Sequence, residues 1–331
     1  MKRRTAWVAA AILAASMGLG MTVSAGEPGI DIGALKGPTS MGLVSMIEKK
    51  GIDQGLYIYN FSMVTAADEL VGKVISGEVD IALVPANVAS VLYNKTEAGV
   101  RVIDINTLGV LYVVECGDAV QSVSDLAGKT VYLTGKGTTP DYVLQYLLEQ
   151  NGLTTDDVTL EYKSEATEVV SVLAEDPTAI GLLPQPFVTA AGMQNENLRI
   201  ALDLADEWAK LQGEGGSSLV TGVTVVRTDY LESDNEFGDP NEDAVKDFLK
   251  EHKESVSYTN ANPAEAAELT AKQGIVANAE IAEKAIPYCN ITCIQGEEMK
   301  TALEGYLQVL ADMDPASIGG SLPGEDFYYI P

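Results

Sequence analysis

Histidine is almost absent from this sequence of 331 residues, which contains one, His252. Its neighbours Lys250, Glu251, Lys253 and Glu254 are all charged, so we expect His252 on a solvated helix face. No other histidine is available as the base of a serine or cysteine nucleophile, and no Gly-x-Ser-x-Gly segment occurs. The sequence therefore argues against a catalytic triad, and it disfavours a zinc site because zinc sites usually draw on several histidines or cysteines.

Cysteine is scarce as well, with three residues, Cys116, Cys289 and Cys293. An odd number in an exported protein leaves at least one thiol outside any disulfide within the chain. Cys289 and Cys293 can pair only if the chain turns between them. Their α-carbons would lie about 13 Å apart along a strand, whereas a disulfide needs about 7 Å or less. The sequence leaves that pairing open.

Basic residues are outnumbered: 21 Lys and Arg stand against 48 Asp and Glu, for a net charge of -27. A surface of this kind repels nucleic acid and anionic lipid, so neither is expected as a partner. An anionic ligand would have to be held by local hydrogen-bond donors against the overall field. The simplest explanation of the acidity is solubility.

The first residues have the pattern of a secretory signal peptide. Basic residues at positions 2–4 precede an apolar run over 6–21, and small residues follow at 23–25. We expect cleavage after residue 25, which leaves 18 basic and 48 acidic residues, a net charge of 18 − 48 = −30. A retained membrane anchor is the alternative, and the paired arginines leave twin-arginine export open beside the general route.

Two later segments share one construction. Segment 37–42 follows an apolar strand at 30–35, and segment 135–140 follows a strand at 130–133. In each, glycine or proline ends the strand, and Thr or Ser caps a helix whose first N–H groups lack partners and attract acceptors. Capping alone is the plainer explanation, and we expect Lys136 to be a solvated loop residue. The ligand candidates here are Gly37, Pro38, Thr39, Ser40, Gly137, Thr138 and Thr139.

Short β-branched runs alternate with helical periodicity along most of the chain, which predicts βαβ units around a parallel sheet. Strands are expected at 30–35, 56–61, 79–84, 101–105, 130–133, 158–162, 179–183 and 198–202, with helices between them. Run 108–116 would cross to a second lobe, and strand 219–226 would return. We expect lobe 1 to comprise 26–109 and 220–331, and lobe 2 to comprise 110–219.

Further ligand candidates stand at expected strand ends. Asn87 follows Pro85, where it would cap a helix, reach the ligand, or do both. Gln185 is the polar residue between two prolines that otherwise form a rigid turn. Tyr59 and Phe61 would close the second strand and either stack on a flat ligand or pack in the core. The return strand adds two hinge or ligand candidates, Thr221 and Gly222.

Three phrases together carry a family resemblance. They are Gly-Glu-Val-Asp-Ile-Ala at 77–82 before a proline-containing loop, Asp-Leu-Ala-Gly-Lys-Thr-Val at 125–131, and Gly-x-Gly-Thr at 135–138. In this order, behind a signal peptide, the chain resembles the solute-binding proteins of ABC importers, in the group of nitrate, sulfonate, taurine and thiamine-precursor binders. The resemblance implies a type II periplasmic-binding-protein fold, with two α/β lobes joined by two crossover strands and a ligand cleft between them.

The function expected from this resemblance is transport. An exported monomer, in the periplasm or on the outer face of the membrane, would close over a small anionic or acceptor-rich solute and deliver it to a permease, without a cofactor or metal. The alternative is an exported enzyme on the same fold using carboxylate acid–base chemistry. The related thiamine-pyrimidine synthase depends on histidine and a cysteine-rich segment, which this sequence lacks.

Overall fold

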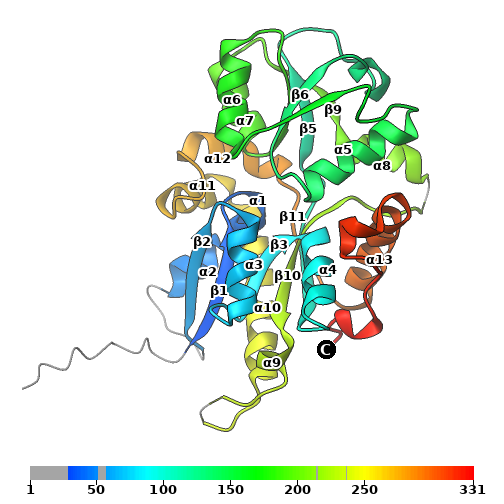
Figure 1. Cartoon of the computed structure of the whole chain (residues 1–331). Coiled ribbons are helices and arrows are strands. Elements are labelled where there is room, and N and C mark those ends of the chain that lie inside the picture. Colours follow the sequence, from blue (N-terminus) through cyan, green and yellow to red (C-terminus); the bar gives the residue numbers. More distant parts are fainter. Residues whose placement is uncertain (1–28, 51–56, 214, 236) are drawn as a thin grey trace, which may run out of the picture.

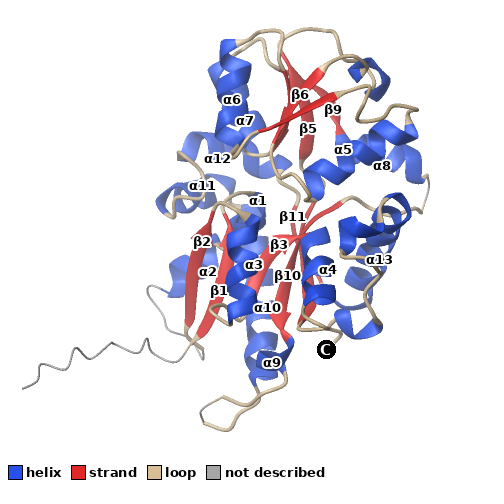
Figure 2. Cartoon of the chain, in the orientation of Figure 1, coloured by secondary structure: helices blue, strands red, loops and turns tan. Residues whose placement is uncertain are grey.

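The computed structural model describes residues 29–50, 57–213, 215–235 and 237–331. The predicted signal peptide lies outside the described residues. Two separate sheets, each covered by helices, form two lobes that lie one above the other (Figures 1 and 2). The predicted α/β class with two lobes is confirmed. Within the described part of the chain, no helix combines the length and apolarity that a membrane crossing requires.

Lobe 1, the lower lobe in Figure 1, has a six-stranded sheet in the order β11-β4-β10-β3-β1-β2. Its strands are β1 (Ile30–Leu35), β2 (Tyr59–Val64), β3 (Ile81–Pro85), β4 (Val100–Leu108), β10 (Val220–Arg227) and β11 (Ile291–Ile294). The expectation of a parallel sheet is wrong for three of its five strand pairings, because β11 pairs antiparallel with β4 and β10 lies antiparallel between β3 and β4. It enters from the other lobe and so runs the opposite way.

The helices of this lobe cover both faces of the sheet or pack on the helices that do, each through an apolar face. They are α1 (Pro38–Met41), α2 (Val44–Lys50), α3 (Ala67–Ser76), α4 (Ala86–Lys95), α9 (Thr228–Leu231), α10 (Asn241–Ala261), α11 (Pro263–Lys272), α12 (Ala279–Ala285) and α13 (Gly296–Met313). In α10, the residues Val245, Phe248, Leu249 and Val256 recur at helical spacing and are buried.

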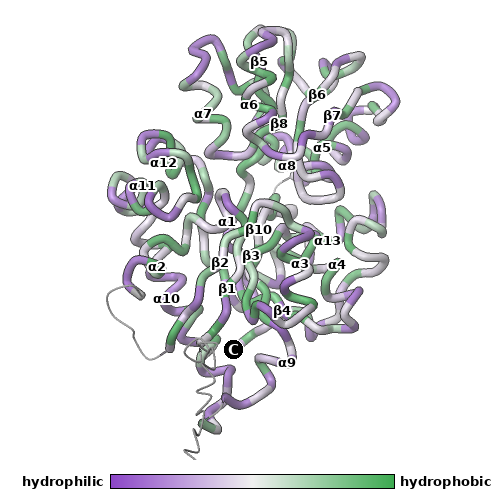
Figure 3. The backbone as a smooth tube through the Cα atoms, turned by 60° about the vertical axis from the view of Figure 1, so that its left-hand side comes forward, coloured by the Kyte–Doolittle hydropathy of each residue, from purple (hydrophilic) through white to green (hydrophobic). Residues whose placement is uncertain are grey.

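Lobe 2 has a five-stranded sheet in the order β7-β6-β8-β5-β9. Its elements are β5 (Leu111–Glu115), β6 (Thr130–Leu133), α5 (Thr139–Gln150), β7 (Thr159–Tyr162), α6 (Ala166–Glu175), β8 (Ile180–Pro184), α7 (Phe187–Gln194), β9 (Arg199–Asp203) and α8 (Leu204–Gln212). The chain enters this lobe between β4 and β5 and leaves it between α8 and β10. Apolar stretches concentrate on the central strands of both lobes (Figure 3).

An aromatic stack joins the lobes on one side. Trp208 of α8 lies 4.8 Å from Tyr146 of α5 and 5.4 Å from Tyr306 of α13, measured between ring centroids. Trp208 and Tyr306 have no exposed surface, and the indole Nε1 donates to the Ser217 carbonyl oxygen at 2.9 Å. One buried apolar cluster therefore runs through both lobes.

His252 contradicts the sequence-based expectation. Its side chain is fully buried, and Nδ1 lies 2.9 Å from Oδ2 of Asp104 on β4. The prediction of a solvated residue is wrong because it weighed only sequence neighbours. One turn away along α10, Phe248 and Val256 are buried on the same face. The thiols of Cys116, Cys289 and Cys293 are all free, so the disulfide left open by the sequence does not form here.

Candidate functional site

Four residues from both lobes meet where α5 approaches lobe 1; we call Asn87, Gly137, Thr139 and Thr221 the junction cluster. The Thr139 hydroxyl oxygen lies 3.4 Å from Oδ1 of Asn87 and 3.5 Å from the carbonyl oxygen of Thr221. Nδ2 of Asn87 donates to the carbonyl oxygen of Gly137 at 3.3 Å. The side chains of Asn87 and Thr139 are fully buried. These contacts join the two lobes.

The first turn of α1 lies against this cluster. A Cβ atom on Gly222 would lie 2.6 Å from Cγ2 of Thr39 and 2.6 Å from Oδ1 of Asn106. Only glycine allows the start of α1 to approach β10 this closely. Thr39 is 7% exposed, so it is nearly covered where the lobes meet. The structure thus brings Thr39 and Gly222 together beside Thr221.

Two hydroxyl groups at this place lack partners. The hydroxyl groups of Thr221 and Tyr306 are both buried. Neither forms a hydrogen bond of good geometry with another described residue. Burial raises the pKa of Tyr306, and the nearby Thr139 side chain counters part of that shift. An unpaired buried polar group costs about 1–3 kcal/mol. Such groups mark places where a water or a ligand supplies the missing bond.

The other candidates at the two helix openings form local bonds. The Gly37 carbonyl oxygen accepts from both the backbone N–H and the hydroxyl of Ser40, at 3.2 and 3.1 Å. The Thr138 hydroxyl donates to the carbonyl oxygen of Gly135 at 2.6 Å. The N–H of Gly137 donates to Oδ2 of Asp141 at 2.7 Å, a position the sequence suggested for a ligand. Pro38 is the first residue of α1.

Gln185 also makes local bonds, at the crossing between the lobes. It is buried directly after β8, its N–H donates to the Val110 carbonyl oxygen at 3.0 Å, and its Oε1 accepts from the Thr189 hydroxyl at 2.8 Å. These bonds hold the turn into α7 in place. None of them joins Gln185 to the junction cluster.

The two aromatic candidates lie elsewhere. Tyr59 begins β2 instead of ending it, three residues later than predicted for that strand. Its ring packs edge-on against Phe248, with centroids 6.1 Å apart, and its hydroxyl donates to Asp247 at 3.1 Å. Phe61 packs beside it, 6.3 Å away. The sequence left open whether Tyr59 and Phe61 stack on a ligand or pack in the core. The structure supports core packing.

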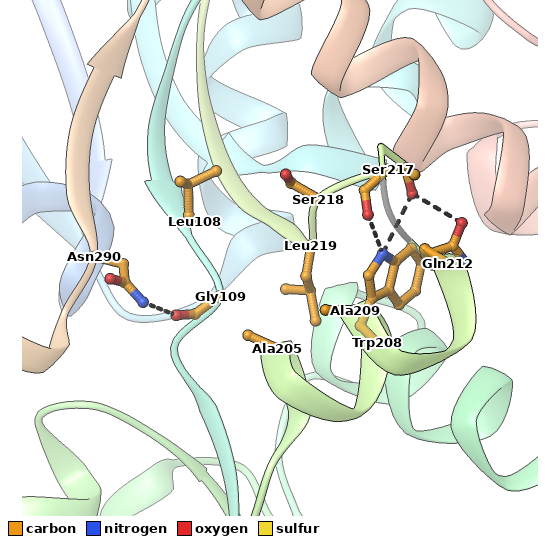
Figure 4. A pocket seen from close by; sticks show the side chains of 12 residues that line it. Leu108, Gly109, Ala205, Trp208, Ala209, Gln212, Ser217, Ser218, Leu219 and Asn290 are labelled. Carbon is orange, nitrogen blue, oxygen red and sulfur yellow. Dashed lines mark hydrogen bonds between the residues drawn. The ribbon is translucent and has the colours of Figure 1, made fainter.

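A cavity of about 290 Å³ lies where the two crossover segments pass each other (Figure 4). Leu108 and Gly109 line it from one segment, Leu219 from the other, and Trp208 from α8. Asn290 donates from its side-chain amide to the carbonyl oxygen of Gly109 (Figure 4). Both crossings, at 108–116 and 219–226, were predicted from the sequence, but the cavity between them and the parts played by Trp208 and Asn290 were not. The sequence signals were a glycine directly after β4 and an asparagine in a loop, where Asn290 has a φ of 44°.

Comparison with known proteins agrees with this architecture. Residues 46–206 match the family described as ABC transporter, phosphonate, periplasmic substrate-binding protein. This match covers just under half of the chain and identifies that part as similar to an ABC-type substrate-binding protein. The predicted family is thereby confirmed at this level, and a periplasmic family implies an extracytoplasmic location. No curated protein matches this sequence.

Several solved structures share the fold of this chain. An ABC transporter protein from Parabacteroides distasonis is 23% identical with a TM-score of 0.73, covering 91% of this chain and 98% of that one. The aliphatic sulphonate binding protein SsuA from Escherichia coli is 15% identical with a TM-score of 0.69, covering 91% and 92%. The alkanesulfonate-binding SsuA from Xanthomonas axonopodis pv. citri, bound to MOPS, is 16% identical with a TM-score of 0.66, covering 90% and 96%. These neighbours are described as transport proteins and not as enzymes.

Proposed function

We propose that this protein captures a small oxoanion, a sulfonate or a phosphonate, between its lobes and delivers it to a membrane permease. The observation that carries the proposal is the junction cluster, where Thr221 presents a buried hydroxyl without a partner between two lobes. Oxoanions offer several strong acceptors to such donors. The match to a phosphonate-binding family and the fold shared with sulfonate-binding proteins support the same ligand class.

The mechanism follows from the division of the site between lobes. Asn87 and Thr221 belong to lobe 1 and Thr139 to lobe 2, so their contacts exist only when the lobes are closed. A ligand that touches both sides therefore favours the closed form by its differential affinity. The proposed ligand contacts are Thr39, Asn87, Thr139, Thr221 and Gly222, while Gly37, Pro38, Ser40, Gly137 and Thr138 shape the two helix openings.

The negative charge of this protein favours a sulfonate over a phosphonate as the ligand. The carboxylate of Asp141 is bound at the start of α5, next to the junction cluster, where it accepts from Gly137, Gln145 and Tyr162. The whole chain carries a net charge of -27. A sulfonate carries one negative charge and a phosphonate carries up to two, so the sulfonate meets less repulsion.

A thermal-shift titration tests the proposal. The protein without residues 1–25 is titrated with methanesulfonate, methylphosphonate, nitrate, acetate and a pyrimidine. A true ligand at 100 times its Kd stabilises the folded state by about 2.7 kcal/mol, so the melting temperature should rise with concentration. We expect the largest rise with the sulfonate. A melting temperature that rises with the pyrimidine alone, or that rises with none of the compounds, would contradict an oxoanion site.

Thr221→Val should separate binding from stability. The change removes an unpaired buried hydroxyl and keeps the shape, so we expect the free energy of unfolding without ligand to rise by about 1 kcal/mol. Sulfonate affinity should fall about 2- to 10-fold, which corresponds to the loss of one hydrogen bond. Denaturant unfolding and calorimetric titration measure the two effects.

Thr228→Val is the matched control. Its hydroxyl is satisfied, donating to the Ala98 carbonyl oxygen at 2.7 Å at the far end of β10. This variant should lose about 1 kcal/mol of stability and bind ligand normally. An unchanged affinity in Thr221→Val would remove Thr221 from the site.

A further inference from the structure

Three potential metal ligands lie together inside lobe 1; we call Asp104, His252 and Cys293 the buried triad. They come from β4, α10 and β11, and their ligand atoms all lie within 4.8 Å of one another. Oδ2 of Asp104 is 2.9 Å from Nδ1 of His252 and 3.8 Å from Sγ of Cys293. The side chains of Asp104 and His252 have no exposed surface, whereas Cys293 is partly exposed. The proposed transport function uses none of these groups.

We propose that the buried triad binds a zinc-like divalent transition metal ion. A carboxylate oxygen, an imidazole nitrogen and a thiolate sulfur are all zinc ligands. Metal–ligand bonds of about 2.0–2.3 Å place neighbouring ligand atoms about 3.3–3.8 Å apart in a tetrahedral site. The separations from Oδ2 of Asp104, 2.9 Å to Nδ1 of His252 and 3.8 Å to Sγ of Cys293, lie near that range, and all three ligand atoms lie within 4.8 Å of one another. Solvent that reaches Cys293 supplies a water as the fourth ligand.

Outer hydrogen bonds already orient two of the ligands. The Thr224 hydroxyl donates to Oδ1 of Asp104 at 2.7 Å and leaves Oδ2 facing the other two ligand atoms. Nε2 of Gln295 lies 3.1 Å from Sγ of Cys293, where it would donate to a thiolate. Partners of this kind fix ligand direction in metal sites. Two of the three side chains of the buried triad therefore already have neighbours that would hold them in the direction a metal ion needs.

Charge and protons balance on binding. The ion displaces the Cys293 thiol proton to solvent, and the His252 proton moves from Nδ1 to Nε2. Two positive charges then meet the thiolate and the carboxylate, so the buried site becomes neutral. Nε2 has no partner among the described residues, and it lies 3.2 Å from where a Cβ of Gly42 would stand. Because residue 42 is a glycine, the His252 ring has room to move toward the ion.

Metal content tests the proposal independently of any transported solute. Tag-free protein is stripped with a chelator, dialysed against Zn²⁺ or Co²⁺, and analysed by mass spectrometry and absorbance. We expect one ion per chain and, with Co²⁺, a thiolate-to-metal charge-transfer band. Cys293→Ser should bind at least tenfold more weakly and lose the band. Cys116→Ser, which changes a thiol outside the buried triad, should behave as the unaltered protein does.

Two results would overturn the site: no bound ion in the unaltered protein, or equal binding in Cys293→Ser. Should Cys293→Ser fail to fold, Thr224→Val provides the second test, because it removes an outer hydrogen bond and no ligand. Loss of an outer partner typically weakens metal binding about 10- to 100-fold. Unchanged zinc affinity in folded Thr224→Val would contradict the proposed geometry.

Discussion

Asn87→Ala is expected to weaken ligand binding about 10- to 100-fold, the effect of losing about 1.4–2.8 kcal/mol. The Asn87 side chain donates to the carbonyl oxygens of Gly137 and Ser317, and its Oδ1 lies 3.4 Å from the Thr139 hydroxyl. Its removal leaves buried groups of both lobes unpaired, each at a cost of about 1–3 kcal/mol. Because two of the partners belong to lobe 2, much of the loss should fall on the closed form. Calorimetric titration measures the affinity.

Asn94→Ala provides the matched control on the same helix. The Asn94 amide donates to the carbonyl oxygens of Ile318 and Ser321, both in lobe 1. We expect this variant to lose stability without a comparable loss of affinity. Equal affinity losses in both variants would show that Asn87 acts through the stability of lobe 1 and not through closure.

Trp208→Ala should lower the free energy of unfolding by about 3–5 kcal/mol, the usual cost of deleting a large buried aromatic side chain. The indole is fully buried between Tyr146 and Tyr306. The change also removes the donor to the Ser217 carbonyl oxygen at the return crossing. Because Tyr306 lies on α13 of lobe 1, the variant should also loosen the contact between lobes. Denaturant unfolding followed by circular dichroism measures the stability.

Tyr146→Phe is the mild companion change. It keeps the ring beside Trp208 and removes only the hydroxyl that accepts from Nε2 of Gln212 at 2.8 Å. A loss of about 1 kcal/mol is expected. A loss under 1 kcal/mol in Trp208→Ala would instead mean that the indole is replaceable by solvent and that the aromatic stack does not hold the lobes.

Local pattern predicted much of the fold. The strand predicted at 30–35 is β1, and the strand at 130–133 is β6, because apolar runs ended by glycine or proline define strands without help from distant contacts. The second strand was predicted to begin too early, since Tyr57 and Ile58 supply β-like residues before the pairing with β1 begins at Tyr59. The antiparallel direction of β10 is set by its pairing with β3 and β4. The residue pattern along a single strand carries no information about the direction of its neighbours.

Part of the candidate site could also be predicted from local sequence signals. Thr39, Asn87, Thr139 and Thr221 all stand at ends of strands or beginnings of helices, where local signals are strong, and the structure brings them together. His252 was misjudged because a helix face is set by residues one turn away, such as Phe248. Trp208 and Asn290 were overlooked because their roles arise only where two distant segments pass each other.

The place of β10 has a consequence for how the chain matures. Lobe 2 is one continuous segment whose strands run from residue 111 to 203, whereas β10, which ends at residue 227, completes the middle of the other sheet. A polypeptide emerging N-terminus first holds β3 and β4 with unpaired edges until that late segment arrives. Unpaired edges are templates for aggregation. We therefore expect the nascent protein to rely on a holding chaperone over that interval, after its upper half has already folded.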